Sequence, residues 1–171
     1  MAVDRCCCRL LLPQLSPLVV EYICRVDGVV TIVAHPRARG ARCSRCRRVS
    51  KRVHSSYDRR LADLPVAGQP TELRLRVRRF FCDQADCRAG TFVEQVQGLT
   101  QPHAQRTAGA QDPLVVVALA LAGRAGSRLA NALGMPVTRS TLLRRIRGLP
   151  DPPVGGGDRP WRGRIRVATR P

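Results

Sequence analysis

The clearest pattern of hydrophobic and polar positions is a strict alternation within residues 71–81. Leucine or valine occupies every second position, and arginine occupies the positions between them. The alternating residues are Leu73, Arg74, Leu75, Arg76, Val77 and Arg78. Because successive side chains of a strand point to opposite faces, this predicts a strand with one apolar face and one row of guanidinium groups. No carboxylate lies between these arginines along the chain, so we expect the row to contact a polyanion; the alternative is a solvated outer face.

Two further β-prone runs lie upstream. Residues 19–26 and 29–34 are separated by Asp27-Gly28, a strong two-residue turn signal, and together they predict a β-hairpin. Residues 49–57 predict a short strand, and the sequence Leu-Pro-Val-Ala-Gly at 64–68 predicts a turn.

The pattern becomes helical after residue 101. Asp112-Pro113 predicts the start of a first helix, with proline at its first position and an apolar body over 114–121. A second helix is expected over 126–133 and a third over 138–147. The part of the chain before residue 101 is therefore β-rich, and the part after it is helical.

The three predicted helices have the pattern of a helix-turn-helix motif. The residues expected at buried or tight-turn positions are Leu129, Ala130, Leu133, Gly134, Met135 and Leu143. A recognition helix reads bases with its N-terminal side chains, here Arg139, Ser140 and Thr141. The side chains expected to reach bases or phosphates further along the helix are Arg144, Arg145 and Arg147. The alternative is an ordinary three-helix bundle with a basic surface.

Four cysteines form two close pairs, Cys43-x2-Cys46 and Cys82-x4-Cys87, with thirty-five residues between the pairs. Each pair can place two thiolates on one turn, and two such turns give the tetrahedral four-thiolate site that structural Zn²⁺ prefers. Too few apolar residues lie between positions 37 and 91 for a large core, so we expect a metal to stabilise this segment. Iron fits the same ligands and stays an alternative. His54 is expected outside the ligand set, because four thiolates fill a tetrahedral site.

The charge of the chain makes nucleic acid the expected partner. The 171 residues include 30 Lys and Arg, all of them Arg except Lys51, against 12 Asp and Glu, which gives a net charge of +18. Arginine binds phosphates and guanine edges in bidentate fashion, which suits a nucleic-acid partner. A ribosome-like or merely soluble basic protein is the alternative.

Neither a signal peptide nor a membrane-spanning segment is expected. Residues 1–13 carry an apolar stretch only at 10–12, with no small-residue cleavage site after it. The longest apolar run, 114–122, is far shorter than the ~20 residues that cross a bilayer. We therefore expect the chain in the cytoplasm. Thiols are reduced in that compartment, which favours metal binding by paired cysteines over disulfides.

Several motifs between residues 10 and 153 resemble the N-terminal half of insertion-sequence transposases of the ISL-three family. The motifs are Cys43-Ser-Arg-Cys46, Arg52-Val-His-Ser-Ser-Tyr57, Arg60-Leu-Ala-Asp-Leu-Pro65, Leu75-Arg-Val-Arg-Arg-Phe-Phe-Cys82, Cys87 followed by Phe92 and Glu94, and Gly134-Met-Pro-Val137 before Ser140-Thr-Leu-Leu-Arg144. The resemblance implies that Cys43, Cys46, Cys82 and Cys87 are zinc ligands. It also implies that the later helices bind the terminal inverted repeats of the element.

In the family, a DDE catalytic domain follows this half. The resemblance implies an RNase-H-like fold whose carboxylates hold two Mg²⁺ ions for DNA cleavage and strand transfer. The sequence departs from the family there, because Val154-Gly-Gly-Gly-Asp158 stands where a Val-Asp-Asp segment is expected. We assign no catalytic residue, expect Mg²⁺ only in a full-length parent, and expect this chain alone neither to cut nor to join DNA. Residues 150–171 are expected to be a disordered basic tail or the product of a shifted reading frame.

The sequence thus predicts an α+β protein. We expect an N-terminal segment with a hairpin over 1–40, a zinc-ribbon-like module over 41–100, a helix-turn-helix domain over 101–149 and the tail over 150–171. The expected function is zinc-stabilised binding of double-stranded DNA as part of a transposase truncated before its catalytic domain, as a homodimer or in association with intact transposase. The alternative is a standalone zinc-ribbon and helix-turn-helix regulator, or a zinc module that binds protein.

Overall fold

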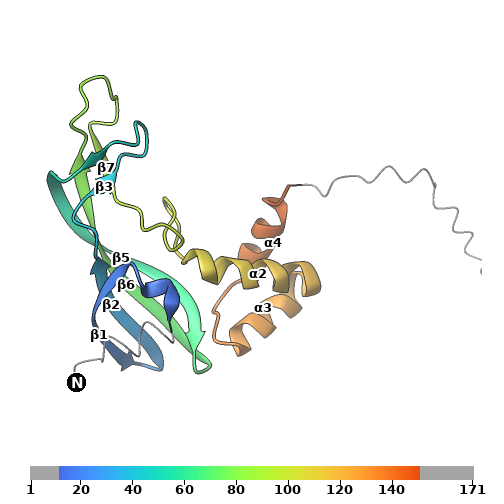
Figure 1. Ribbon diagram of the computed structural model, residues 1–171. Coiled ribbons are helices and arrows are strands. Elements are labelled where there is room, and N and C mark those ends of the chain that lie inside the picture. The colour runs from blue at the N-terminus through green and yellow to red at the C-terminus, as the bar shows by residue number, and fades with distance from the viewer. Residues whose placement is uncertain (1–11, 151–171) are drawn as a thin grey trace, which may run out of the picture.

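The structure is a computed structural model that describes residues 12–150 (Figure 1). Within that range a β-rich part is followed by a helical part. The first consists of η1 (Pro13–Leu15), β1 (Leu18–Val26), β2 (Val29–Pro36), β3 (Ala41–Arg42), β4 (Val49–Ser50), β5 (Val53–Val66), β6 (Gln69–Phe81) and β7 (Thr91–Val93). The second consists of α2 (Ala108–Leu121), α3 (Gly123–Ala132) and α4 (Arg139–Arg147). The α+β class is confirmed, and the predicted tail lies outside the described residues.

One sheet organises the β-rich part, with strand order β1-β2-β6-β5 and β7 added to the end of β6. The predicted hairpin is confirmed as β1 and β2, and its turn residues Asp27 and Gly28 have positive φ angles of 50° and 78°. Strand β2 runs parallel to β6, whereas β5 runs antiparallel to it. The first hairpin is therefore part of the same sheet as the strand that leads to the second cysteine pair.

The apolar face of β6 forms the centre of the core. Leu73, Leu75 and Val77 are fully buried, as their alternation predicts, and they pack with residues from every long strand. Ile32 of β2 and Leu61 of β5 belong to the same cluster. The expected boundary at residue 40 therefore falls between elements that share one sheet and one core.

Strand β5 is longer than its sequence predicts. Instead of a short strand over 49–57 and a turn over 64–68, the chain stays extended from Val53 to Val66. The turn is confined to Ala67 and Gly68, with φ angles of 51° and 73°. Pro65 is tolerated because β5 is an edge strand, where the missing N–H breaks no ladder bond on the open side.

The first long helix begins five residues before the predicted start at Pro113. Thr107 caps it, because its hydroxyl oxygen accepts from the Ala110 N–H at 3.3 Å. The same hydroxyl donates to the buried Asp63 carboxylate at 2.5 Å. This contact fixes the cap against β5, so Pro113 lies inside the helix rather than at its start.

The other two helices occur near their predicted positions, and small residues determine how they pack. Ala130 and Met135 are buried and Gly134 has a φ of 76°, as expected. Leu129 and Leu133 are instead 41% and 49% exposed. The buried face of α3 is instead formed by the small residues Gly126 and Ala130, because α4 packs closely against it. A Cβ added at Gly126 would lie 3.2 Å from the Leu142 side chain. Leu142 is the buried leucine of α4, one position before the predicted one.

The helices lie beside the sheet and contact it at the end of β5 (Figure 1). Residues 105–107 pair with the outer edge of β5. The Ala62 N–H donates to the Gln105 carbonyl at 3.0 Å, and the Thr107 N–H donates to the Ala62 carbonyl at 3.0 Å. The α3–α4 turn packs on the β5–β6 turn, where a Cβ at Gly134 would lie 2.8 Å from the Gly68 carbonyl oxygen. Within residues 12–150, no helix is long and apolar enough to cross a membrane.

Candidate metal centre and nucleic-acid interface

The first cysteine pair lies on a tight turn between β3 and β4. The Cys43 N–H donates to the Arg48 carbonyl at 2.8 Å, and the Arg47 N–H donates to the Cys43 carbonyl at 3.1 Å. Arg47 has a positive φ of 63°, which reverses the chain directly after Cys46. These bonds place both thiols of the pair on the same side of the turn.

The second pair follows the end of β6. The Cys82 N–H donates to the Gly90 carbonyl at 2.8 Å, and the Cys87 N–H donates to the Gln84 carbonyl at 3.1 Å. Strand β7 then returns along β6 and pairs Phe92 with Phe80. The long strand therefore delivers the second turn to the first.

The two turns bring all four sulfur atoms within 4.8 Å of one another. The Sγ atoms of Cys43 and Cys87 are 3.9 Å apart, and those of Cys46 and Cys82 are 3.6 Å apart. Zn–S bonds of about 2.3 Å in a tetrahedron require sulfur atoms about 3.8 Å apart. The donor set and its spacing therefore fit a structural zinc ion, and the four cysteines are positioned to bind a metal.

The metal centre shares a small core with two phenylalanines. Cys43 is buried beside Phe80 and Phe92, whose rings stack with centroids 5.9 Å apart. The Arg78 guanidinium lies over the Phe80 ring, 5.0 Å from its centroid. This core is separate from the main sheet core, so the metal can contribute much of its stability.

The thiol pKa values differ within the cluster. Burial raises the pKa of Cys43, but hydrogen bonds from the backbone N–H groups of Cys46 and Arg45 outweigh it and lower the pKa to about 7. The Gln84 N–H favours the thiolate of Cys82, yet burial and the three neighbouring thiols together raise its pKa to about 12. Without a cation the cluster therefore resists full ionisation, because closely spaced thiolates repel one another.

Each arginine of the β6 row has a carboxylate partner. Arg74 pairs with Glu72 at 2.7 Å, and Arg76 pairs with Asp58 at 3.0 Å. The absence of a carboxylate between these arginines along the chain therefore does not leave the row without counter-ions. Glu72 lies two residues before Arg74 on the same face of β6, and Asp58 lies opposite Arg76 on the neighbouring strand β5. The DNA contacts expected of this row stay a prediction.

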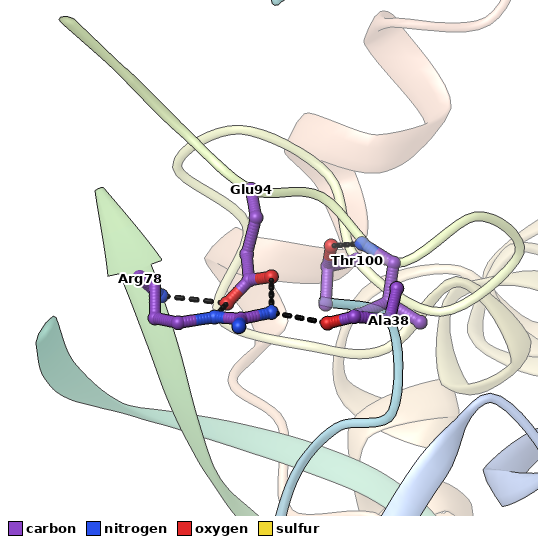
Figure 2. Close-up of polar contacts among 5 residues, drawn as sticks. Ala38, Arg78, Glu94 and Thr100 are labelled. Carbon is purple, nitrogen blue, oxygen red and sulfur yellow. Dashed lines mark hydrogen bonds and ion pairs between the residues drawn. The ribbon is translucent and has the colours of Figure 1, made fainter. Parts of the chain in front are cut away.

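Arg78 forms the most buried of these ion pairs, with Glu94 (Figure 2). Glu94, only 3% exposed, accepts from the Arg78 backbone N–H at 2.7 Å, from Nε at 3.0 Å and from Nη2 at 2.8 Å. Nη2 also donates to the Ala38 carbonyl at 2.5 Å. Close by in Figure 2, Thr100 Oγ1 accepts from the Val96 N–H at 2.9 Å. The pair thus joins β6, the end of β7 and the loop that leads to the first cysteine pair.

Sequence reasoning did not find the role of Glu94, although one signal was available. Glu94 is the sole acidic residue between Asp86 and Asp112 in a strongly basic chain. A carboxylate alone in such a segment is a natural partner for a partly buried arginine.

Helix α4 carries all of the predicted helix-turn-helix contact residues, and most of them are exposed. Arg139, Ser140, Arg144 and Arg147 are exposed, and Thr141 and Arg145 are half-buried. Thr138 caps the helix by accepting from the Thr141 N–H at 3.3 Å. Nη1 of Arg145 donates to the Gln111 side chain at 2.8 Å, so this arginine also ties α4 to α2.

The turn before α4 is held by side chains of α3. The Ser127 hydroxyl donates to the Val137 carbonyl at 2.7 Å, and the Asn131 amide donates to the same oxygen at 2.9 Å. Nη2 of Arg106 donates to the Pro136 carbonyl at 2.7 Å. From Pro113 to Pro150 no acidic residue occurs, so every charged side chain of α3 and α4 is positive.

His54 lies outside the metal cluster, as expected. Its ring contacts Phe81 edge-on with centroids 4.8 Å apart, and its Nδ1 lies 3.0 Å from the Ser55 hydroxyl. The ligand set within residues 12–150 therefore consists of four cysteines.

Comparison with known proteins identifies a family model that matches part of the chain. No curated protein and no solved structure matches the chain. Residues 39–87, which contain both cysteine pairs and all of β5 and β6, match the family model described as the zinc-finger of transposase IS204/IS1001/IS1096/IS1165. The four-cysteine segment is thus similar to the zinc ribbon of these transposases.

Proposed function

We propose that this chain is the zinc-stabilised DNA-binding portion of an insertion-sequence transposase and that it recognises the terminal inverted repeats of its element. The observation that carries the proposal is the coincidence of the transposase zinc-finger match with a four-sulfur cluster of tetrahedral spacing. The proposal concerns binding, and it assigns no cleavage or strand-transfer step to residues 12–150.

The helices α3 and α4 act as a helix-turn-helix in this proposal. The turn between them contains Gly134 at positive φ and is held by the Ser127 and Asn131 bonds to the Val137 carbonyl. Helix α4 enters the major groove with Arg139, Ser140 and Thr141 towards base edges. Arg144 and Arg147 contact bases or phosphates, and Arg145 contributes charge while bonded to α2.

The metal has a structural role in this proposal. Zinc joins the two cysteine turns and so orders the end of the sheet that carries them, where the buried core consists of only Cys43, Phe80 and Phe92 within the described residues. The ordered segment adds positive charge near the duplex, including Arg45 and Arg47 beside the first cysteine pair. The chain acts as a homodimer or together with an intact transposase, since inverted repeats present two equivalent sites.

The test is binding of the zinc-loaded chain to DNA that flanks its own gene, measured by fluorescence anisotropy with random DNA of equal length as the control. Preference for an inverted repeat on both sides of the gene supports the transposase function. Preference for a promoter elsewhere, with no such repeats, supports the regulator alternative. Equal affinity for all duplexes contradicts sequence-specific recognition, because non-specific affinity comes from phosphate contacts alone.

A further inference from the structure

A pocket of about 370 Å³ opens on the core-facing side of the sheet, at the edge formed by β5. Its walls come from four parts of the chain: the first cysteine turn, β5, β7 and the loop before α2. The lining residues used below are Ser44, Tyr57, Arg59, Val93, Gln95 and His103. The volume falls within the roughly 300–1,000 Å³ of typical small-molecule sites.

Tyr57 supplies an aromatic surface to this pocket. It lies opposite Val77 in the β5–β6 register, so its side chain is on the core-facing side of the sheet. It is nevertheless 42% exposed. Within residues 12–150 its hydroxyl makes no hydrogen bond, so both the ring and the hydroxyl are available to a ligand.

Arg59 supplies a positive charge that no carboxylate neutralises within the described part of the chain. Its Nη2 donates to the carbonyls of Gln101 at 3.0 Å and Ala104 at 2.8 Å, which fixes the guanidinium beside the pocket. A guanidinium has five N–H donors, so the three on Nε and Nη1 remain for a ligand. Arg74, Arg76 and Arg78 on the opposite face are each paired with a carboxylate.

The remaining lining residues suit a flat polar ligand. Val93 provides apolar surface, and Ser44, Gln95 and His103 provide hydrogen-bonding groups. None of the lining residues is acidic. Arg79 lies on the same side of the sheet, opposite Ser55 and Val93, and is exposed. The pocket therefore combines a stacking ring, a fixed cation and neutral polar groups.

We propose that this pocket binds a single unstacked nucleotide, with its base against the Tyr57 ring and its phosphate at Arg59. Aromatic rings bind bases by stacking without strong sequence preference, and arginine binds the adjacent phosphate. The proposal deepens the DNA-binding function proposed above and rests on it for the source of the nucleotide, a DNA strand. It gives the chain a second contact surface, on β5, distinct from α4.

The test measures the affinity of the zinc-loaded chain for a random-sequence duplex in three forms: blunt, with a single-stranded adenosine extension, and with an abasic extension of equal length. The extension with bases should raise affinity, and the abasic one should not, although it carries the same phosphates. Tyr57→Ala should remove the gain, reducing affinity for the extended duplex roughly 5- to 150-fold with little effect on the blunt duplex. Tyr57→Phe should keep most of the gain, because the ring remains.

Two controls separate this proposal from the general DNA-binding function. Tyr22→Ala removes another exposed tyrosine and should leave the gain intact. Wild-type affinity for the blunt duplex reports on the general function, and the gain from the extension reports on the pocket. An equal gain from base-bearing and abasic extensions, or an unchanged gain in Tyr57→Ala, would overturn the proposal. Binding of free adenosine monophosphate is measured as well. If it binds but the extension does not raise the affinity for DNA, the pocket takes a free nucleotide, and its proposed role in DNA binding is overturned.

Discussion

The buried ion pair between Arg78 and Glu94 gives the sharpest prediction about stability. Glu94→Ala removes the acceptor of three N–H groups and leaves a guanidinium that is only 24% exposed without its counter-charge. Removing one member of a buried pair costs about 3–5 kcal/mol. Arg78 keeps its bond to the Ala38 carbonyl and its contact with the Phe80 ring, so we expect a loss near the lower limit, about 3 kcal/mol.

The assay is urea unfolding of the zinc-saturated protein, followed by circular dichroism. With a denaturant slope of about 2 kcal/mol per molar, the midpoint should fall by about 1.5 M. Asp58→Ala is the matched control, because it breaks an arginine–carboxylate pair on the same strand whose side chains are 62% and 61% exposed. That change should cost less than about 1 kcal/mol. Equal losses for Glu94→Ala and Asp58→Ala would refute the argument that burial determines the effect.

Three other predictions follow from the helices and the metal centre. Removal of zinc by a chelator should abolish ordered structure around the cysteine turns, and unchanged circular dichroism and melting without metal would exclude a structural role. Arg144→Ala should weaken binding to the target sequence by about 1–3 kcal/mol if the side chain reads a base, whereas an equal loss on random DNA would assign it to phosphate. Gly134→Ala should lower the free energy of unfolding by more than the ~1–2 kcal/mol cost of positive φ alone. Gly28→Ala is its control, since Gly28 has a similar φ of 78° and no atom within 4 Å of the added Cβ, and equal losses would contradict the close contact with Gly68.

Local sequence patterns correctly predicted those strands and turns in which the pattern matches the burial of the residues in the fold. The alternation in β6 reappears as buried and exposed positions, and Asp27-Gly28 forms the turn between β1 and β2. The cysteine spacing predicted the four-sulfur cluster, because two short turns at the ends of strands restrict the thiols to a small volume. These features depend on residues close in sequence or on a chemically distinctive set.

The features that sequence did not predict depend on contacts between distant segments. The start of α2 is set by the Thr107 hydroxyl and the buried Asp63 carboxylate, forty-four residues apart. Two of the three counter-ions of the β6 arginines, Asp58 and Glu94, lie on another strand or beyond the second cysteine pair, whereas Glu72 is only two residues before Arg74. Neither propensity nor periodicity contains this information, because both describe neighbours along the chain.

The contact between the α3–α4 turn and the β5–β6 turn has a consequence for the geometry of the DNA target. Gly134 against Gly68, together with the Arg106 bond to the Pro136 carbonyl, joins the helices to the sheet without a flexible linker. In the DNA-binding function proposed above, α4 and the basic surface beside the cysteine turns would therefore meet a duplex at a fixed separation and on a fixed side. The DNA segments that these two surfaces would contact must then keep a constant helical phase. Half a helical turn, about 5 base pairs, inserted between those segments would rotate one of them to the far side of the duplex and out of reach.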